Sequence, residues 1–360
     1  MMIKFRYWFV LLLLITAVRS TSLLLAETTQ PTATQLMDEF GYGVSVLPWT
    51  AEGMPGFQWK KVYLPPSVRL PNHILYRMPY TAYDHLDLAG FAARVQRLTQ
   101  KYGDFIEAYE IGNEVNLYRT GWEGFPRANE YAELLCVAYS EIKHNDPNAI
   151  VVSAGLAPVG RIVGNWNGHA GHNGQVQDER EFMREFLAAG GAECADVIGY
   201  HPIGFRANFD AEPDVDGGTP ETNCINGFCF RGVEKIRDIL VEYGYAEKKI
   251  WATEMGWLVA PAYDGCLSYI NWQGRGWQIV SPEAQAENIL GAFQYTEANW
   301  PWLGAMFVFN YNFNEYHPWW TCQHMGSYGI KGGLAERTLL EWHLPQRTYL
   351  PTVARRSYLP

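Results

Sequence analysis

The sequence lacks a hydrophobic run long enough to form a comfortable membrane span. Its most apolar stretch, residues 7–18, is shorter than the roughly 20 residues that a spanning helix needs. Lys4 and Arg6 precede this stretch, and a small residue, Ala26, stands near the end, a pattern typical of a secretory signal peptide. We therefore expect residues 1–26 to be a signal peptide and the protein to be extracellular. The alternative is that residues 1–26 remain as an uncleaved anchor.

The sequence also lacks clusters of basic residues. Lys and Arg together number 28 against 38 Asp and Glu, which gives a formal net charge of −10. Removal of residues 1–26 takes away three basic residues and no acid, so the charge becomes −13. This balance argues against nucleic acid as a partner and against an anionic membrane surface once the signal peptide is cleaved. A neutral ligand fits the overall charge better.

Several motifs of common enzyme classes are missing. There is no Gly-rich dinucleotide loop after the first strand-like run, no P-loop, no HExxH and no Ser-His-Asp signature. His169 and His172 lie in a Gly/Asn loop with no acid or cysteine nearby, which is a weak zinc signal. We therefore expect neither a cofactor nor a metal ion.

Cysteine is scarce but sufficient for disulfides in an exported chain. The six cysteines are residues 136, 194, 224, 229, 266 and 322. Cys224 and Cys229 share the short Gly/Asn loop "NCINGFCF", which favours a local bridge, and the last two cysteines are the next best pair. The first two fall in a helical pattern and just before an apolar strand, so we interpret them as buried thiols.

Apolar strand-like runs alternate with amphipathic helical patterns along most of the chain. The eight strand candidates are residues 41–46, 59–64, 73–78, 105–114, 149–156, 195–201, 249–255 and 304–310. The five helical patterns are residues 87–103, 127–144, 178–191, 231–244 and 281–298. Apolar strands separated by helices indicate a covered parallel sheet, and eight of them in one domain favour a closed barrel.

The predicted fold class is α/β, a single (β/α)8 TIM barrel over residues 41–343. The segments between the first three strand candidates are too short for full helices, so we expect the first two helices to be abbreviated. Residues 27–40 are interpreted as an N-terminal linker. Residues 344–360 are Pro-rich and basic, which indicates a tail.

Two glutamates stand where two of the predicted strands end. Glu114 closes the fourth strand candidate and Glu254 lies at the end of the seventh. They are 140 residues apart, which is three βα units of about 47 residues each, as in a (β/α)8 barrel whose chemistry sits at the strand C-termini. A pair of carboxyl groups facing each other across a barrel mouth is what retaining glycoside hydrolysis requires. An Asn-Glu dipeptide alone carries no weight, because it recurs at 129–130 and 314–315.

The segments "YEIGNEVN" and "IWATEMGW" resemble the clan A retaining (β/α)8 glycoside hydrolases, which include cellulase-like and β-xylosidase-like families. The resemblance extends over residues 70–340 in the order of elements. It implies an oligo- or polysaccharide substrate, with Glu114 as acid/base, Glu254 as nucleophile and Asn113 as a ligand of the sugar 2-hydroxyl. It also implies that Arg77 supports the nucleophile and that His201 lines the same rim.

Further substrate contacts are expected from the loops after the strands. Trp122 and Trp257 lie in or next to these loops, where exposed rings stack on sugars. Phe309 stands where the family commonly has a Trp that floors the sugar subsite, and Asn310 follows it. We predict that these four residues bind substrate.

The chain departs from the family pattern in three motifs. Gly112 and Val115 flank Asn113-Glu114 in place of Trp and Pro, Ile203 replaces a Tyr that holds the nucleophile, and Phe309 replaces the subsite Trp. The changes at Gly112, Ile203 and Phe309 motivate a second hypothesis, a non-catalytic carbohydrate-binding barrel derived from such an enzyme. An unrelated barrel enzyme is the third hypothesis, with fold analogy alone behind it.

Overall fold

The structure is a computed structural model, and it describes residues 32–47, 54, 56–80, 84–118, 125–213, 219, 221–315 and 322–343. The expected signal peptide (1–26) and tail (344–360) lie outside the described residues and stay predictions. No helix among the described residues is long and apolar enough to cross a membrane.

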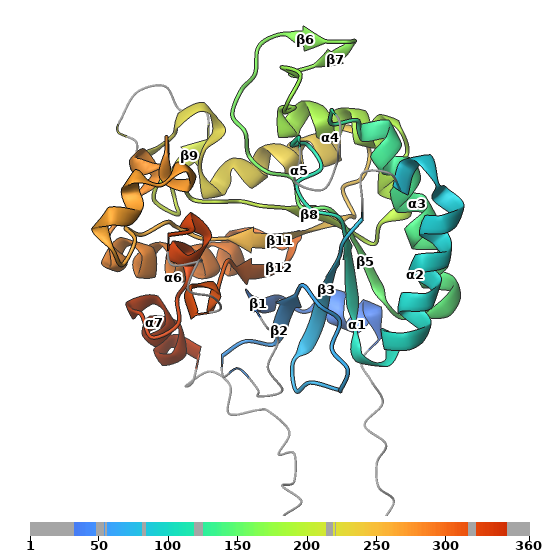
Figure 1. Cartoon of the computed structure of the whole chain (residues 1–360), viewed down its shortest axis with the longest axis horizontal. Helices are drawn as coiled ribbons and strands as arrows, with labels where there is room; N and C mark the ends of the chain where they lie inside the picture. The colour runs from blue at the N-terminus through green and yellow to red at the C-terminus, as the bar shows by residue number, and fades with distance from the viewer. Residues whose placement is uncertain are drawn as a thin grey trace, which may run out of the picture. The chain divides into compact units, whose positions relative to one another are not determined.

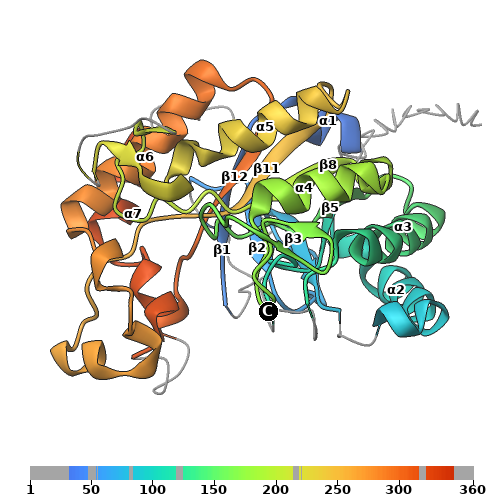
Figure 2. The same cartoon turned by 90° about the horizontal axis from the view of Figure 1, so that it is seen from above.

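Eight parallel strands close into a barrel, in the order β1-β12-β11-β8-β5-β4-β3-β2. The strands are β1 (Gly41–Ser45), β2 (Trp59–Val62), β3 (His73–Met78), β4 (Ala108–Ile111), β5 (Ile150–Ser153), β8 (Val197–Tyr200), β11 (Lys249–Met255) and β12 (Leu303–Val308). The predicted (β/α)8 TIM barrel is therefore confirmed. Figure 1 shows the strands crossing the centre of the molecule, and Figure 2 shows the same barrel from above with helices around it.

Seven α-helices accompany the strands in the described part of the chain. They are α1 (Ala33–Asp38), α2 (Leu88–Tyr102), α3 (Ala128–Asn145), α4 (Glu179–Ala188), α5 (Val233–Glu242), α6 (Pro282–Asn299) and α7 (Leu334–His343). Side chains cap several N-termini: Asp87 accepts from Gly90 N at α2, and Ser281 accepts from Ala284 N at α6. Residues 63–72, between β2 and β3, contain no helix, in agreement with the expected abbreviation.

The interior of the barrel and its outer layer form separate hydrophobic clusters. Large side chains such as Trp59, Trp251 and Phe307 fill the interior, while the larger cluster packs between the strands and the helices. Helix α1, which falls within the predicted linker, packs against the interior cluster. Lys249 at the start of β11 donates to Met37 O of α1 at 2.8 Å, so this short helix lies at the N-terminal end of the barrel.

Small excursions extend from the loops after the strands. The loop after β5 carries the antiparallel hairpin β6 (Asn165–Trp166) and β7 (His169–Ala170), which projects from the barrel in Figure 1. The loop after β8 carries the short pair β9 (Glu212–Pro213) and β10 (Asn223–Cys224). Such loops shape the mouth of the barrel, where (β/α)8 enzymes place their sites.

All six cysteines are paired. Cys224–Cys229 and Cys266–Cys322 form disulfides, as predicted. The prediction of two buried thiols was wrong, because Cys136 and Cys194 form a third disulfide with their Cα atoms 4.7 Å apart. Cys136 lies in α3 and Cys194 ends the 3-10 helix η3 (Gly191–Cys194), and these elements pack together although 58 residues separate the two cysteines.

Candidate active site

Glu114 reaches the barrel mouth on a tight turn, because β4 ends earlier than the sequence predicted. The strand stops at Ile111, and Gly112 takes a φ of 90°. A Cβ at Gly112 would lie 2.2 Å from the Tyr80 ring, so only glycine fits this position. Glu114 itself has a φ of 47°, a conformation that costs about 1–3 kcal/mol and clusters at functional sites. The turn explains why Gly112 replaces the bulky residue of the family pattern.

The two predicted carboxylates come together around one histidine. One oxygen each of Glu114 and Glu254 and a ring nitrogen of His201 all lie within 4.8 Å of one another. His201 Nδ1 is 3.1 Å from Glu114 Oε1 and 3.8 Å from Glu254 Oε2. The side chain of Glu114 is 24% exposed and that of Glu254 only 9%, so water reaches the first more readily. His201 is itself fully buried behind them, nearer to the carboxylates than a rim position implies.

Two buried charges beneath this pair were missed by the sequence analysis. Lys61 Nζ on β2 is 2.7 Å from Glu110 Oε2 on β4 and 3.0 Å from Glu254 Oε1 on β11. The side chains of Lys61 and Glu110 are both 0% exposed. Glu110 Oε1 also accepts from Gly155 N at 3.2 Å and lies 3.8 Å from His201 Nε2. The signal was present in "WKKVYL" and "AYEIGNE", since a charge within a buried strand requires a partner.

These contacts keep the buried groups ionised. Burial raises the pKa of Glu254, but Lys61, His201 and Arg77 outweigh it and bring the pKa below its ordinary value. Burial likewise opposes ionisation of Glu110, yet Lys61 and His201 lower its pKa to about 2. Burial lowers the pKa of His201, while the surrounding carboxylates raise it to about 9. At neutral pH the site thus holds a protonated His201 beside the ionised Glu110 and Glu254.

Tyr63, directly after β2, forms the contact with Glu254 that Ile203 cannot form. Tyr63 Oη donates to Glu254 Oε1 at 3.5 Å, which is the limit of a hydrogen bond. Burial and the nearby charge of Glu254 raise the pKa of Tyr63 well above its ordinary value, so it stays a donor. Tyr200, by contrast, is buried in the outer cluster between strands and helices.

Arg77 is placed differently from the expectation. The cation in direct contact with Glu254 is Lys61, whereas the Arg77 guanidinium lies over the Tyr63 ring, 4.5 Å from its centroid. The charge of Arg77 still helps to lower the pKa of Glu254. Arg77 therefore supports the predicted nucleophile through its field, and its side chain faces the cavity described next.

A cavity of about 510 Å³ opens above the carboxylates, within the usual size range of small-molecule sites. Four residues singled out in the sequence line it: Arg77, Asn113, Glu114 and Glu254. Phe309 lines it too, with its ring held edge-on by Phe313 and Tyr328. Asn113 Oδ1 is buried and has no hydrogen-bond partner among the described residues.

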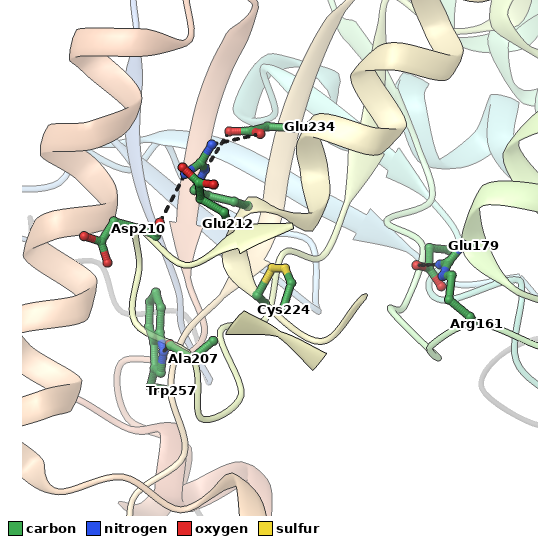
Figure 3. Close-up of a disulfide and its surroundings, with 10 residues drawn as sticks. Arg161, Glu179, Ala207, Asp210, Glu212, Cys224, Glu234 and Trp257 are labelled. Carbon is green, nitrogen blue, oxygen red and sulfur yellow. Dashed lines mark hydrogen bonds and ion pairs between the residues drawn. A yellow bond between two sulfur atoms is a disulfide. The ribbon is translucent and has the colours of Figure 1, made fainter. Parts of the chain in front are cut away.

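Two predicted substrate contacts prove to hold the scaffold instead. Trp257 is fully buried, and its Nε1 donates to Ala207 O at 2.7 Å; Figure 3 shows the ring against Ala207, beside the disulfide of Cys224. Asn310 is also fully buried, donating to Met325 O and accepting from Phe313 N. Periodicity does not distinguish a loop residue that faces the cavity from one that pins the loop down. Trp122 lies outside the described residues.

Two sets of side chains bear on metal binding, one at the carboxylates and one at the β6–β7 hairpin. Glu114, His201 and Glu254 are close enough to hold an ion, but Lys61 and the protonated His201 already supply positive charge there. His169 pairs with Glu185 at 2.7 Å, and the His172 ring stacks on Trp166, so both steady the β6–β7 hairpin. Lys61 and His201 therefore already compensate the carboxylate charge of the first set within the chain.

The fold is shared with solved glycoside hydrolases. No family model matches the sequence, and no curated protein does. A family 39 glycoside hydrolase from the gut symbiont Bacteroides cellulosilyticus WH2 matches with a TM-score of 0.52 and 14% identity, over 86% of this chain and 64% of that chain. A glucosidase from Croceicoccus marinus matches with a TM-score of 0.55 and 12% identity, over 84% of this chain and 67% of that chain.

This chain has the fold of a glycoside hydrolase barrel. The resemblance to clan A that the two glutamate motifs carry is thereby confirmed at the level of the fold. The chain spans about two thirds of the length of the two solved structures.

Proposed function

We propose that the protein is a secreted glycoside hydrolase that cleaves O-glycosidic bonds of an oligo- or polysaccharide with retention. The separation of Glu114 and Glu254, with one oxygen of each within 4.8 Å, is the observation that carries the proposal. Retaining enzymes hold their carboxyl groups about 5–5.5 Å apart, whereas inverting enzymes need about 6.5–9.5 Å to admit a water molecule. The cavity above the pair provides room for the sugar.

In the proposed mechanism Glu254 attacks the anomeric carbon while Glu114 donates its proton to the leaving oxygen. Lys61 and Tyr63 both engage Oε1 of Glu254, which leaves Oε2 on the side of Glu114 and His201 for attack. Glu114 then takes a proton from water, and this water releases the sugar from the glycosyl enzyme. The greater exposure of Glu114 suits a group that exchanges protons with water.

The buried charged groups support the proposed roles of Glu254 and Glu114. Lys61 and His201 favour the carboxylate form of Glu254, so it is ready to act as a nucleophile at neutral pH. His201 donates to Glu114 Oε1 and thereby orients the carboxyl group toward the cavity. Asn113, with its free Oδ1 beside Glu114, is the proposed ligand of the sugar 2-hydroxyl.

Secretion is part of the proposal. Three disulfides are typical of proteins that fold in an oxidising compartment, and they agree with the signal peptide expected from residues 1–26. The alternative, a binding barrel without turnover, rested on the changes at Gly112, Ile203 and Phe309. Tyr63, which directly follows β2, supplies a hydrogen bond to Glu254, which weakens the argument from Ile203.

The test is hydrolysis of aryl glycosides of both anomeric configurations and of plant and microbial polysaccharides by residues 27–360. We expect Glu254→Ala to abolish turnover, and azide to restore it in Glu114→Ala with formation of a glycosyl azide of retained configuration. The matched control is Glu130→Ala. It removes the glutamate of the Asn-Glu pair at the start of α3 and should leave turnover intact. Folded protein without turnover across the panel would contradict the proposal and favour the binding barrel.

A further inference from the structure

Two arginines face the cavity without an acidic partner. Arg77 and Arg275 both line it, from opposite halves of the barrel sequence. Arg275 Nε donates to Asn271 O at 3.1 Å, which fixes the orientation of the guanidinium, and Arg77 lies over Tyr63. No carboxylate of the described residues lies within 4 Å of either guanidinium. Although the overall charge is −10, the cavity therefore presents two cations to a ligand in addition to Glu114 and Glu254.

Tyr328 lies between Arg275 and the proposed catalytic glutamates in the electrostatics of the cavity. Arg275 belongs to the loop after β11, and Tyr328 ends the 3-10 helix η11 (His324–Tyr328) after β12. Burial raises the pKa of Tyr328; Arg275 opposes this shift, while Glu114 and Glu254 add to it. The Tyr328 hydroxyl thus lies within electrostatic reach of Arg275 on one side and of both carboxylates on the other. A sugar at the carboxylates would extend toward Arg275.

Two other polar side chains that line the cavity have an atom without a hydrogen-bond partner among the described residues. Gln278, three residues after Arg275, is 7% exposed and lines the cavity, and its Oε1 has no hydrogen-bond partner among the described residues. His324 also lines the cavity, and its Nδ1 is equally without a described partner. Burial and then the charge of Arg275 lower the pKa of His324 to about 4, so this ring is neutral at physiological pH. The loops after β11 and β12 thus bring to the cavity the Arg275 cation and two side chains, Gln278 and His324, that each have one buried polar atom without a described partner.

We propose that Arg275 binds an anionic group on the sugar, so that the substrate is an acidic glycan bearing a carboxylate, as in a uronic acid, or a sulfate ester. This inference rests on the proposed function of the same cavity. The planar guanidinium donates two parallel hydrogen bonds to such an anion, and a cation in a half-buried cavity gains most when an anion neutralises it. Gln278 Oε1 accepts from a neighbouring sugar hydroxyl.

The first arm of the test compares matched aryl glycosides that differ only at C6. Glucuronides are paired with glucosides and galacturonides with galactosides, in both anomeric forms, and kcat/KM is measured for the unmodified chain and for Arg275→Gln. For the sugar pair that the unmodified chain hydrolyses, we expect a higher kcat/KM on the uronide than on the neutral glycoside. Arg275→Gln should reduce this preference about 10- to 100-fold, which is the usual effect of removing one charged hydrogen-bond partner. The control Arg184→Gln, an arginine paired with Glu242 on the outer helices, should keep the preference. Preference for the neutral member, or an equal loss on both members in Arg275→Gln, overturns the inference.

The second arm does not depend on hydrolysis. Calorimetry measures binding of glucuronic and galacturonic acids, of the corresponding neutral sugars and of their 6-sulfates. Tighter binding of the acids, or of the sulfates, that is lost in Arg275→Gln supports the inference and identifies the anion. Equal binding of charged and neutral sugars overturns it. Selective binding of the charged sugars without turnover would contradict the proposed hydrolase and still support the anion subsite. The two failures are therefore distinguishable.

Discussion

At the scale of single residues, the site depends on a lysine that joins two carboxylates. Lys61 contacts both Glu110 and Glu254, and neither Lys61 nor Glu110 is exposed. The sequence predicted Glu114 and Glu254 because each stands at the end of a predicted strand. It did not predict the buried pair of Lys61 and Glu110, since the partner of a buried charge depends on how β2, β4 and β11 meet in the barrel.

We predict that Lys61→Met lowers the free energy of unfolding by about 3–5 kcal/mol, because Glu110 loses its counter-charge while it stays buried. Turnover should fall about 100-fold or more, because Glu254 loses a charged donor. Adding Glu110→Leu should restore most of the stability and none of the activity. Chemical denaturation and kcat measurements check this, and recovery of turnover in the double variant would show that Lys61 serves the scaffold alone.

His201 makes stability depend on pH in the alkaline range. Its pKa in the folded protein, about 9, exceeds the ordinary value of 6.5, so folding favours the protonated ring. This stabilisation is fully present below about pH 6.5 and is lost as the pH rises through 9, with an upper limit of about 3 kcal/mol. Glu110, with its pKa lowered to about 2, acts oppositely and loses its contribution only as the pH falls below about 4.5 toward 2.

We therefore expect urea midpoints to decline as the pH rises from about 6.5 through 9. In His201→Asn the decline above pH 6.5 should be much shallower, whatever the stability of the variant at pH 6. A slope identical to that of the unmodified chain would mean that other groups set the alkaline dependence.

At the scale of elements, strand ends were predictable where the strand simply stops. β3 and β11 have the predicted bounds, residues 73–78 and 249–255. β4 ends three residues early because Gly112 leaves the sheet with a positive φ, a choice of turn that apolar periodicity does not reveal. Trp257 and Asn310 show a related limit, since both were assigned to the correct loops but point into the scaffold.

The turn after β4 gives a prediction at this scale. Gly112→Ala combines a strained φ with a clash against Tyr80, so it should displace Glu114 and reduce turnover strongly. Gly190→Ala is the matched control: its φ is 79°, but a Cβ there meets nothing within 4 Å. Both variants should lose about 1–3 kcal/mol of stability from the strained backbone. Only Gly112→Ala should lose additional stability and activity, as measured by unfolding and aryl glycoside assays.

At the scale of the whole molecule, the alternation of elements was enough to predict the barrel, because eight covered parallel strands have few other arrangements. The disulfide between α3 and η3 was not predictable from the sequence, since it depends on which helix packs against the segment that leads into β8. Its loop of 58 residues implies a loop-closure contribution of about 4 kcal/mol, against about 2 kcal/mol for the 5-residue loop of Cys224–Cys229. We expect Cys136→Ala/Cys194→Ala to lower the melting temperature more than Cys224→Ala/Cys229→Ala; the reverse order would show that the local bridge is the main constraint.

The central claim is that Glu254 forms a covalent bond to the sugar, with Glu114 as its acid/base. The most direct measurement is mass spectrometry of the protein after incubation with a 2-deoxy-2-fluoro glycoside of the sugar that the hydrolysis panel identifies. The account predicts one added glycosyl group, mapped to the peptide that contains Glu254 and absent in Glu254→Gln. A protein that turns over this sugar with inversion and without an adduct, or that carries the adduct on Glu114, would contradict it.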